Sequence, residues 1–327
     1  SGQTRIVKLL QKYGVDLNLQ AIDGFTALMV ACQNGYTEIV ELLLDRGANP
    51  DLQANDGFNS LMLASQNGHL EVVRMLLDAG AEVDLHDRAY QTTALIQASL
   101  EGHTEIIKLL LDKGADVNLQ NNEGATALFM ASINGHVNVV KLLLEKGADV
   151  DQRSDDGANA LFVASLNGHT EVVKLLLENG ADVRTNDGTN ALVISAQDGL
   201  TETVKSILYK GDNPDLYNIG RITALISTSQ NGRLEVVRFL LAKGVNPYLQ
   251  ENSLKKTAFM RASKSGHIEI VKLLITKDVQ TELWRTDKFT TLMVASINGH
   301  TEVVKLLLEK GAEMDAKSNE GVTPLIF

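Results

Sequence analysis

The chain has 327 residues, a formal net charge of −11 and a single cysteine. One cysteine excludes an intramolecular disulfide framework and suits a reducing compartment, and the acidic balance argues against nucleic acid as the main partner, because phosphate binding needs a basic surface. The sequence contains no apolar run of 18 residues, so we expect a cytoplasmic protein without direct membrane insertion.

A pattern of about 33 residues repeats along the chain. A partial repeat comes first, over residues 1–23, with a helix predicted at Thr4–Tyr13. Full repeats are predicted to start near residues 24, 57, 91, 124, 157, 188, 221, 255 and 288. A partial repeat over 321–327, with an opening helix at Thr323–Phe327, comes last. Because both ends fall inside a repeat, we expect the chain to be part of a longer protein. The leucine column, which marks each opening helix, consists of Leu28, Leu61, Leu95, Leu128, Leu161, Leu192, Leu225, Phe259 and Leu292.

The repeat that starts at residue 124 shows the local structure of all of them. Ala127–Ile133 is apolar or small at nearly every position, which predicts a short opening helix, and Gly135 ends it. Val137–Glu145 has the i, i+3, i+4 spacing of a second helix with one buried face. Gly147 follows its last turn, where glycine can form a left-handed cap, and a polar loop leads on to the next repeat. One such helix pair is too small to bury its own apolar face, so the repeats must stack.

These segments resemble the ankyrin repeat over essentially the whole chain. The resemblance is carried by the Thr/Asn-Ala-Leu opening, the Ala-Ser-x-Asn-Gly-His link, the Glu-Val-Val-Lys-Leu-Leu-Leu second helix and the Gly-Ala-Asp-Val tail. It implies an all-α ankyrin-repeat solenoid of stacked helix pairs with extended loops, and one array over residues 1–327. The family's proline after the opening threonine is found only at Pro324. The family's histidine after the opening leucine is replaced by an apolar residue, which predicts a more apolar seam, at Met29, Met62, Ile96, Phe129, Phe162, Val193, Ile226, Met260 and Met293.

Two positions depart from the regular repeat. The linker Val183–Gly188 is two residues shorter than its counterparts, and Asp278 stands where other repeats have the cap glycine. We expect irregular stacking at both places.

The candidate chemical groups favour structural roles. Cys32 shares a column with serines and is interpreted as a core residue, and Glu/Lys pairs such as Glu171 and Lys174 are spaced as surface ion pairs. No phosphate loop, nucleophile elbow or Cys-x-x-Cys motif is present. We therefore predict no catalytic residue, no cofactor and no metal. Six histidines share one column at intervals of about 10 Å, too far apart to bind one ion, and are interpreted as turn residues that bond backbone: His69, His103, His136, His169, His267 and His300.

The opening helices carry the first candidate binding surface. Residues two, five and six positions after the leucine column are expected to face away from the core. Leu100, Met130, Ile133, Val163 and Leu166 would then form one exposed apolar patch, and such patches mark partner surfaces. The alternative is that neighbouring loops cover them.

Polar and charged residues extend the candidate surface. The amides of Asn134 and Asn167 are expected to hydrogen-bond the backbone of an extended partner. Lys256, Arg261 and Lys264 form a cationic cluster that would attract acidic residues of a partner, and Trp284 lies on a nearby loop. The alternatives are a solvated run of charges and a packed tryptophan.

Together these features favour a non-catalytic scaffold, a monomeric array that binds a protein or peptide segment in its concave groove. The resemblance agrees, because partners of the ankyrin family dock in the groove and on the loop tips. Two alternatives remain. The array is the regulatory or targeting part of a larger enzyme, channel or membrane-associated protein, or it is a mechanical spacer, for which a uniformly polar groove would be expected.

Overall fold

The structure, a computed structural model, describes residues 2–183, 191–210, 214–250, 257–275, 290–318 and 321–326. Within them, every regular element is a helix. The chain divides into two compact units, Ser1–Asp187 (unit 1) and Gly188–Phe327 (unit 2). None of the helices described is long and apolar enough to cross a membrane.

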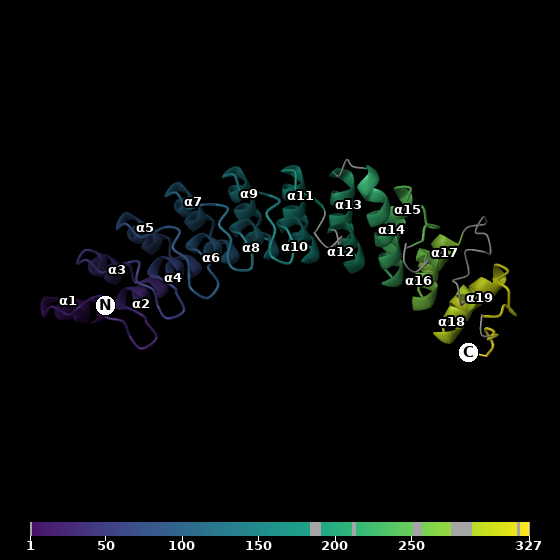
Figure 1. Ribbon diagram of the computed structural model, residues 1–327, viewed down its shortest axis with the longest axis horizontal. Helices are drawn as coiled ribbons and strands as arrows, with labels where there is room; N and C mark the ends of the chain where they lie inside the picture. The colour runs from purple at the N-terminus through teal and green to yellow at the C-terminus, as the bar shows by residue number, and fades with distance from the viewer. Residues whose placement is uncertain are drawn as a thin grey trace. The chain divides into compact units, whose positions relative to one another are not determined.

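Unit 1 has two rows of helices that alternate along the chain (Figure 1). The even-numbered helices α2–α10 open the repeats, the odd-numbered helices α3–α11 are second helices, and neighbours within each row pack against one another. The helices are α1 (Gly2–Lys12), α2 (Ala27–Gln33), α3 (Thr37–Leu44), α4 (Ser60–Gln66), α5 (Leu70–Asp78), α6 (Ala94–Glu101), α7 (Thr104–Asp112), α8 (Ala127–Ile133), α9 (Val137–Glu145), α10 (Ala160–Leu166) and α11 (Thr170–Glu178).

Unit 2 repeats this arrangement with opening helices α12, α14, α16 and α18, each followed by its second helix. The helices are α12 (Ala191–Asp198), α13 (Thr201–Lys210), α14 (Pro214–Gln230), α15 (Leu234–Ala242), α16 (Ala258–Ser265), α17 (Ile268–Leu274), α18 (Thr291–Ile297) and α19 (Thr301–Glu309).

The opening helices begin where a threonine or asparagine caps them. The Thr126 hydroxyl accepts a hydrogen bond from Phe129 N at 3.2 Å, and Asn159 Oδ1 accepts one from Phe162 N at 2.9 Å. Such caps satisfy one of the backbone N–H groups that the first turn of a helix leaves without a partner. The predicted bounds of α8 and α9 are confirmed.

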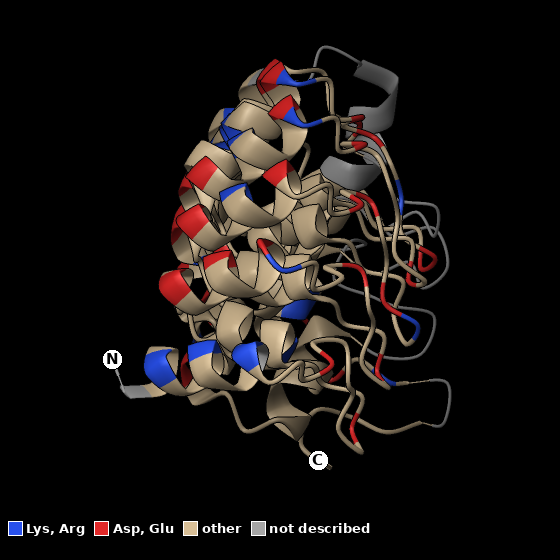
Figure 2. Ribbon diagram, turned by 90° about the vertical axis from the view of Figure 1, so that its left-hand side faces the viewer, with Lys and Arg blue, Asp and Glu red and all other residues tan. Residues whose placement is uncertain are grey.

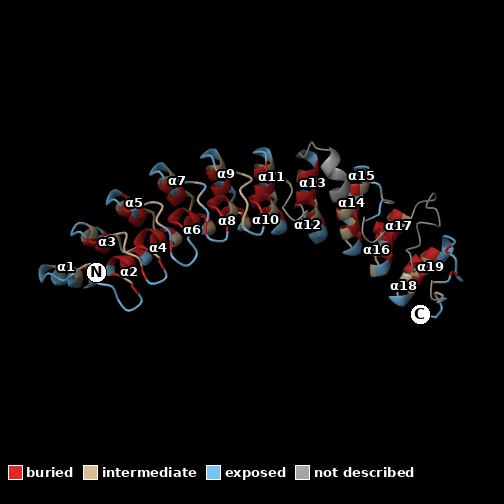
Figure 3. Cartoon of the chain, viewed as in Figure 1, coloured by how far each residue is buried: buried red, intermediate tan, exposed pale blue. Residues whose placement is uncertain are grey.

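The core of each helix pair is built from the leucine column and the residues around it (Figure 3). The apolar residues after the leucine column are also buried at Met29, Met62 and Met293, whereas Phe129 and Phe162 are half-buried. At Met29 the sulfur accepts a hydrogen bond from Thr26 N at 3.4 Å. A methionine thus caps the backbone while it fills the seam, because its sulfur is a weak acceptor.

Two predictions about helices are wrong. The polar loop expected to lead into the repeat that starts near residue 221 is helical from Pro214 onward, where α14 begins. Proline suits the first turn of a helix, and the Asp-Gly turn of other repeats is replaced there by Ile219-Gly220. The predicted helix Thr323–Phe327 is a turn in its described part, with one hydrogen bond from Ile326 N to Thr323 O. So short a segment gains too few hydrogen bonds to form a helix.

The two irregular places lie largely outside the described residues. Of the short linker only Val183 is described, and Asp278 is not. The helix that precedes Asp278, α17, ends at Leu274, and Ile275 is already extended with φ −86° and ψ 93°. The irregular stacking expected at these places stays a prediction, as does the single array over residues 1–327.

Candidate functional site

Four of the apolar residues expected to form the patch lie on three neighbouring opening helices of unit 1. Leu100 belongs to α6, Met130 and Ile133 to α8, and Leu166 to α10. Leu166 is 46% exposed, and the other three are half-buried. Because α6 packs against α8 and α8 against α10, the four side chains follow one another across three repeats. We call them the apolar row.

Val163 does not belong to this surface. The sequence predicts it as exposed, but its exposure is 5%. It lies two residues after Leu161, on the flank of α10. The residue at the same position of α2, Val30, is 46% exposed, and α2 packs against only one described opening helix, α4. Packing between neighbouring opening helices therefore covers this flank at Val163 and leaves it half-buried at Met130 of α8, and the more open positions are those five and six residues after the leucine column.

The two asparagines beside the row are partly engaged within the chain. Asn134 follows α8 and donates through Nδ2 to Leu100 O at 2.8 Å, so it ties one repeat to the previous one. Asn167 follows α10 and donates through Nδ2 to Val163 O at 2.9 Å. An amide can form up to four hydrogen bonds, so each keeps capacity for the predicted bond to a partner backbone.

The loops that precede the opening helices form short hairpins, which we call fingers. Finger 2 (residues 54–58), finger 3 (87–92), finger 4 (121–125) and finger 5 (154–158) are each closed by a backbone hydrogen bond between the first N–H and the last carbonyl. Neighbouring fingers are also joined. Asn122 N donates to Tyr90 O at 2.8 Å, and Asp155 N donates to Glu123 O at 3.0 Å. Their tips are thus held in register beside the row.

A hollow of about 330 Å³ lies between fingers 4 and 5. The half-buried Phe129 contributes its apolar wall, and the exposed Glu123, Asp155 and Asp156 contribute carboxylates. Phe129 comes from α8, the helix that carries Met130 and Ile133, so the hollow adjoins the apolar row. An aromatic ring beside carboxylates can accommodate a cationic side chain.

Finger 3 is a feature that the sequence interpretation missed. It has one residue more than finger 2, and Gln91 takes φ 55° at the position of Gly57 and Gly124. Its tip presents Tyr90, which is 58% exposed. The signal was present in the sequence, because the step from Leu61 to Leu95 is 34 residues.

The histidine column bonds backbone, as predicted, and the carbonyl belongs to the preceding repeat. His136 Nε2 lies 2.9 Å from Leu100 O, and His169 Nε2 lies 3.1 Å from Ile133 O. The imidazole ring of His136 lies directly beneath Gly102. Arg233 occupies the same column and donates through Nε to Gln197 O at 3.2 Å. These residues hold the seams between repeats.

Two other interpretations are confirmed. Glu171 and Lys174 form an ion pair at 2.6 Å on the exposed side of α11, where such pairs add little to stability. Cys32 is fully buried, and burial raises the pKa of its thiol to about 12. A thiol held in its neutral form is a poor nucleophile.

The cationic candidates belong to unit 2. Arg261 is half-buried and Lys264 is exposed, both on α16. Lys256 and Trp284 lie outside the described residues.

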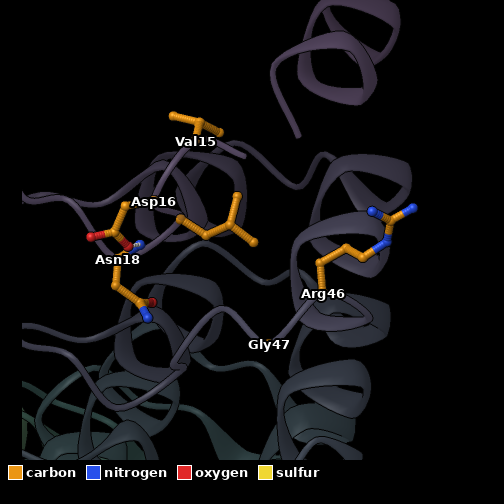
Figure 4. Close-up of a pocket in the computed structure, with 6 residues that line it drawn as sticks. Val15, Asp16, Asn18, Arg46 and Gly47 are labelled. Atoms are coloured by element: carbon orange, nitrogen blue, oxygen red, sulfur yellow. Dashed lines mark hydrogen bonds between the residues drawn. The ribbon is translucent and has the colours of Figure 1, made fainter. Parts of the chain in front are cut away.

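A separate hollow of about 330 Å³ lies between residues 15–18 and the turn after α3 (Figure 4). Two of its polar side chains bind backbone. Asp16 Oδ1 accepts from Asn18 N at 2.9 Å, and Asn18 Oδ1 accepts from Asn49 N at 2.9 Å. Both side chains stabilise the loop, and nothing in their arrangement points to a ligand.

Comparison with known proteins gives one finding. A family model described as ankyrin repeats (3 copies) matches residues 1–87, 82–154, 149–218, 192–287 and 277–327. A search of curated proteins gave no match.

Proposed function

The chain belongs to the ankyrin-repeat family, whose members are generally protein–protein interaction modules and typically non-catalytic, and we propose that unit 1 binds an extended segment of a partner protein. The segment lies on α6, α8 and α10. Three repeats at about 10 Å each correspond to about nine extended residues.

The observation that carries this proposal is the apolar row. Leu100, Met130, Ile133 and Leu166 keep part of their surface open to solvent on three neighbouring helices, whereas the leucine column beneath them is buried. A spacer gains nothing from apolar side chains at these positions. Contact with a partner removes them from water, and full burial of one such side chain contributes about 1.5–3 kcal/mol. Asn134 and Asn167 flank the row and supply hydrogen bonds to the backbone of the segment.

Unit 2 has its own proposed contact. Arg261 and Lys264 lie one helical turn apart on α16 and would attract acidic residues of a partner. Lys256 and Trp284 remain sequence-based candidates for the same contact. Reversal of the charges at Arg261 and Lys264 should mainly slow association and lose its effect at high salt.

We propose further that the array is monomeric and works in the cytoplasm. The single cysteine, buried at Cys32, supports a reducing setting, in which disulfides are rare.

The apolar row can be tested without a known partner. A library of random peptides, displayed on phage and long enough to span three repeats, is selected against the chain. The enriched peptides are then titrated against the double variant Ile133→Asp with Leu166→Asp. Loss of two apolar contacts should weaken binding by about tenfold or more, while the circular dichroism spectrum and the melting temperature stay close to those of the parent.

The matched control adds the same charge to the same unit. Val137 and Asn138 are exposed on α9, a second helix, so Val137→Asp with Asn138→Asp should leave binding unchanged. Equal binding to both double variants, or no enrichment, would contradict the proposal. Unfolding of the row variant would show that Ile133 and Leu166 belong to the core.

A further inference from the structure

The two units differ sharply in charge. Unit 1 contains 26 Asp and Glu residues against 13 Lys and Arg residues, a net charge of −13. Unit 2 contains 15 acidic against 17 basic residues, a net charge of +2. The acidity of the whole chain therefore comes from the unit that carries the apolar row.

Within unit 1 the excess of acid lies on the loops and opening helices. Residues 48–67, 81–101, 115–134 and 148–167 contain two basic residues, Arg88 and Arg153. Arg153 is engaged within the chain, since it donates to Gly157 O at 3.0 Å and lies 3.6 Å from Asp182. Figure 2 marks acidic residues on the loops and also on the helices of the whole chain. The acidic residues in these segments are Asp51, Asp56, Glu82, Asp84, Asp87, Glu101, Asp116, Glu123, Asp149, Asp151, Asp155 and Asp156.

Some of these acids stabilise the loops, and others are open to solvent. Asp51 accepts from Glu82 N at 2.9 Å, and Asp87 is fully buried. By contrast, Glu101 is exposed at the end of α6, next to Leu100, and Glu123 and Asp155 are exposed at the tips of fingers 4 and 5. The apolar row thus has carboxylates at its α6 end and along its finger side.

We propose that the segment bound by unit 1 is basic, with apolar residues that alternate with lysine or arginine. This inference rests on the proposed function and names the chemistry of the partner. Successive side chains of an extended segment point to opposite sides. One set of side chains packs on the apolar row, and the other set reaches the fingers.

The hollow between fingers 4 and 5 receives one of the basic side chains. Its aliphatic part or guanidinium group lies against the ring of Phe129, and its charge lies among Glu123, Asp155 and Asp156. Cation–π contacts favour arginine over lysine, and arginine can bond a carboxylate through two N–H groups. The hydrogen bond from Asp155 N to Glu123 O fixes the two fingers in place, so the hollow is formed before the segment arrives.

The negative potential of unit 1 also sets the kinetics. Opposite charges accelerate encounter and lose this effect as salt screens them. The association rate of the segment should therefore fall with ionic strength, whereas dissociation should depend mainly on the apolar contacts.

The test begins with the peptides enriched from the random library, restricted to those whose binding is lost in the Ile133→Asp with Leu166→Asp variant. We expect lysine and arginine to exceed aspartate and glutamate in this set. A representative peptide is then synthesised with all its basic residues changed to glutamine. It should bind about tenfold more weakly than its parent at low salt, with the difference shrinking at high salt.

A pair of double variants separates the hollow from the general acidity of the chain. Glu123→Gln with Asp155→Asn removes two charges at the fingers. Asparagine already occupies the position of Asp155 in two other fingers, at Asn55 and Asn122, so the fold should persist. The control, Glu41→Gln with Glu145→Gln, removes two exposed charges from α3 and α9. We expect the finger variant to weaken binding of the basic peptide about fivefold or more, with little change for its glutamine version and for the control.

The possible results distinguish the two proposals. The peptides whose binding is lost in the Ile133→Asp with Leu166→Asp variant could show no excess of basic residues. That result would overturn this inference and leave the proposed function standing. Equal losses in the two double variants would show that binding follows net charge alone, which also overturns it. If no enriched peptide loses its binding in the Ile133→Asp with Leu166→Asp variant, both the proposed function and this inference are overturned.

Discussion

The carboxylate of Asp87 accepts two hydrogen bonds from Thr92, one from the backbone N–H at 2.8 Å and one from the hydroxyl group. It also accepts from Ala89 N at 2.8 Å and from Tyr90 N at 2.7 Å. A single buried side chain thus binds three of the six backbone N–H groups of finger 3. This arrangement replaces the glycine turn of the other fingers and holds Tyr90 at the tip.

Asp87→Asn should destabilise the chain at neutral pH. Asparagine keeps one acceptor oxygen, as Asn121 shows at the same position of finger 4, where it accepts from Glu123 N and Ala125 N. It cannot accept the bonds made by the second carboxylate oxygen. We expect a loss of about 1–3 kcal/mol in the free energy of unfolding at pH 7, measured by urea denaturation. An unchanged free energy would contradict the role of Asp87 in finger 3.

The same variant should reveal a pH dependence. Burial alone raises the pKa of Asp87, but the hydrogen bonds from the Thr92 hydroxyl and from the backbone N–H groups outweigh it and hold the pKa below its usual value. The unfolded chain binds this proton near pH 4, so the stabilisation is present above that pH and is lost as the pH falls through the lower folded value. The difference between parent and Asp87→Asn should therefore be smaller at about pH 3 than at pH 7. An equal difference at both would contradict it.

Gln91→Gly should stabilise finger 3. Gln91 has φ 55°, a conformation that costs a residue with a Cβ atom about 1 kcal/mol relative to glycine. Part of this gain in stability is lost, because glycine increases the conformational entropy of the unfolded chain. We expect a small rise in the melting temperature, with Gln120→Gly, in the regular loop before finger 4, as a control that lowers it. Gln120 Nε2 donates to Gly124 O and Arg153 O, bonds that glycine cannot make.

Substitutions at two glycines allow the cost of backbone strain to be measured separately from the cost of a clash between repeats. Gly102 and Gly114 have φ of 84° and 93°, but a Cβ atom would lie 2.7 Å from His136 Nδ1 at Gly102 and would meet nothing within 4 Å at Gly114. Gly114→Ala should cost about 1–2 kcal/mol from backbone strain alone. Gly102→Ala should cost a further 1–3 kcal/mol or so from the clash.

The added cost of Gly102→Ala should disappear when the histidine is absent. In the His136→Ala background the Cβ atom has room, so the two effects should not add. Additive losses in the double variant, measured by equilibrium unfolding, would show that the added cost of Gly102→Ala does not come from a clash with the imidazole ring.

Ser132→Ala should be neutral or stabilising. Ser132 Oγ is buried and has no hydrogen-bond partner in the part of the chain that the structure describes, and Cys32 and Ala196 occupy the same column. Removal of a buried hydroxyl without a partner relieves a desolvation penalty of about 1 kcal/mol or more. Ser195→Ala is the control that should destabilise, since Ser195 Oγ donates to Ala191 O at 2.7 Å. Equal losses at both sites would refute this account.

Sequence periodicity predicted most of the fold because each repeat places the same residue types at the same steps. The bounds of α8 and α9 follow from glycine and capping residues that act locally. The length of α14 was not predicted because it depends on a turn signal that differs at Ile219, where several other repeats have aspartate before the glycine. Leu100, Met130, Ile133 and Leu166, the four members of the apolar row, were all among the residues predicted from the sequence. Val163 was predicted wrongly, because helical periodicity indicates which face of a helix is open but not how much of its flank the neighbouring helices cover.

The acidic hollow between fingers 4 and 5 could not be predicted from the sequence for a related reason. Glu123 and Asp155 lie 32 residues apart in the sequence, and only the hydrogen bond between their fingers shows that they share one hollow. The net charge of the whole chain, −11, also hides the difference between unit 1, with a net charge of −13, and unit 2, with a net charge of +2.

The contact of a histidine with a carbonyl of the preceding repeat recurs with the same geometry at several seams. If residues 115–147 were deleted, His169 would stand where His136 stands, opposite Leu100 O, and Asp155 N would take the place of Asn122 N opposite Tyr90 O. Recombination between equivalent codons can therefore add or remove a whole repeat without creating a seam of a new kind. In such a protein the length of the binding surface is free to change during evolution while the chemistry that joins its parts stays constant.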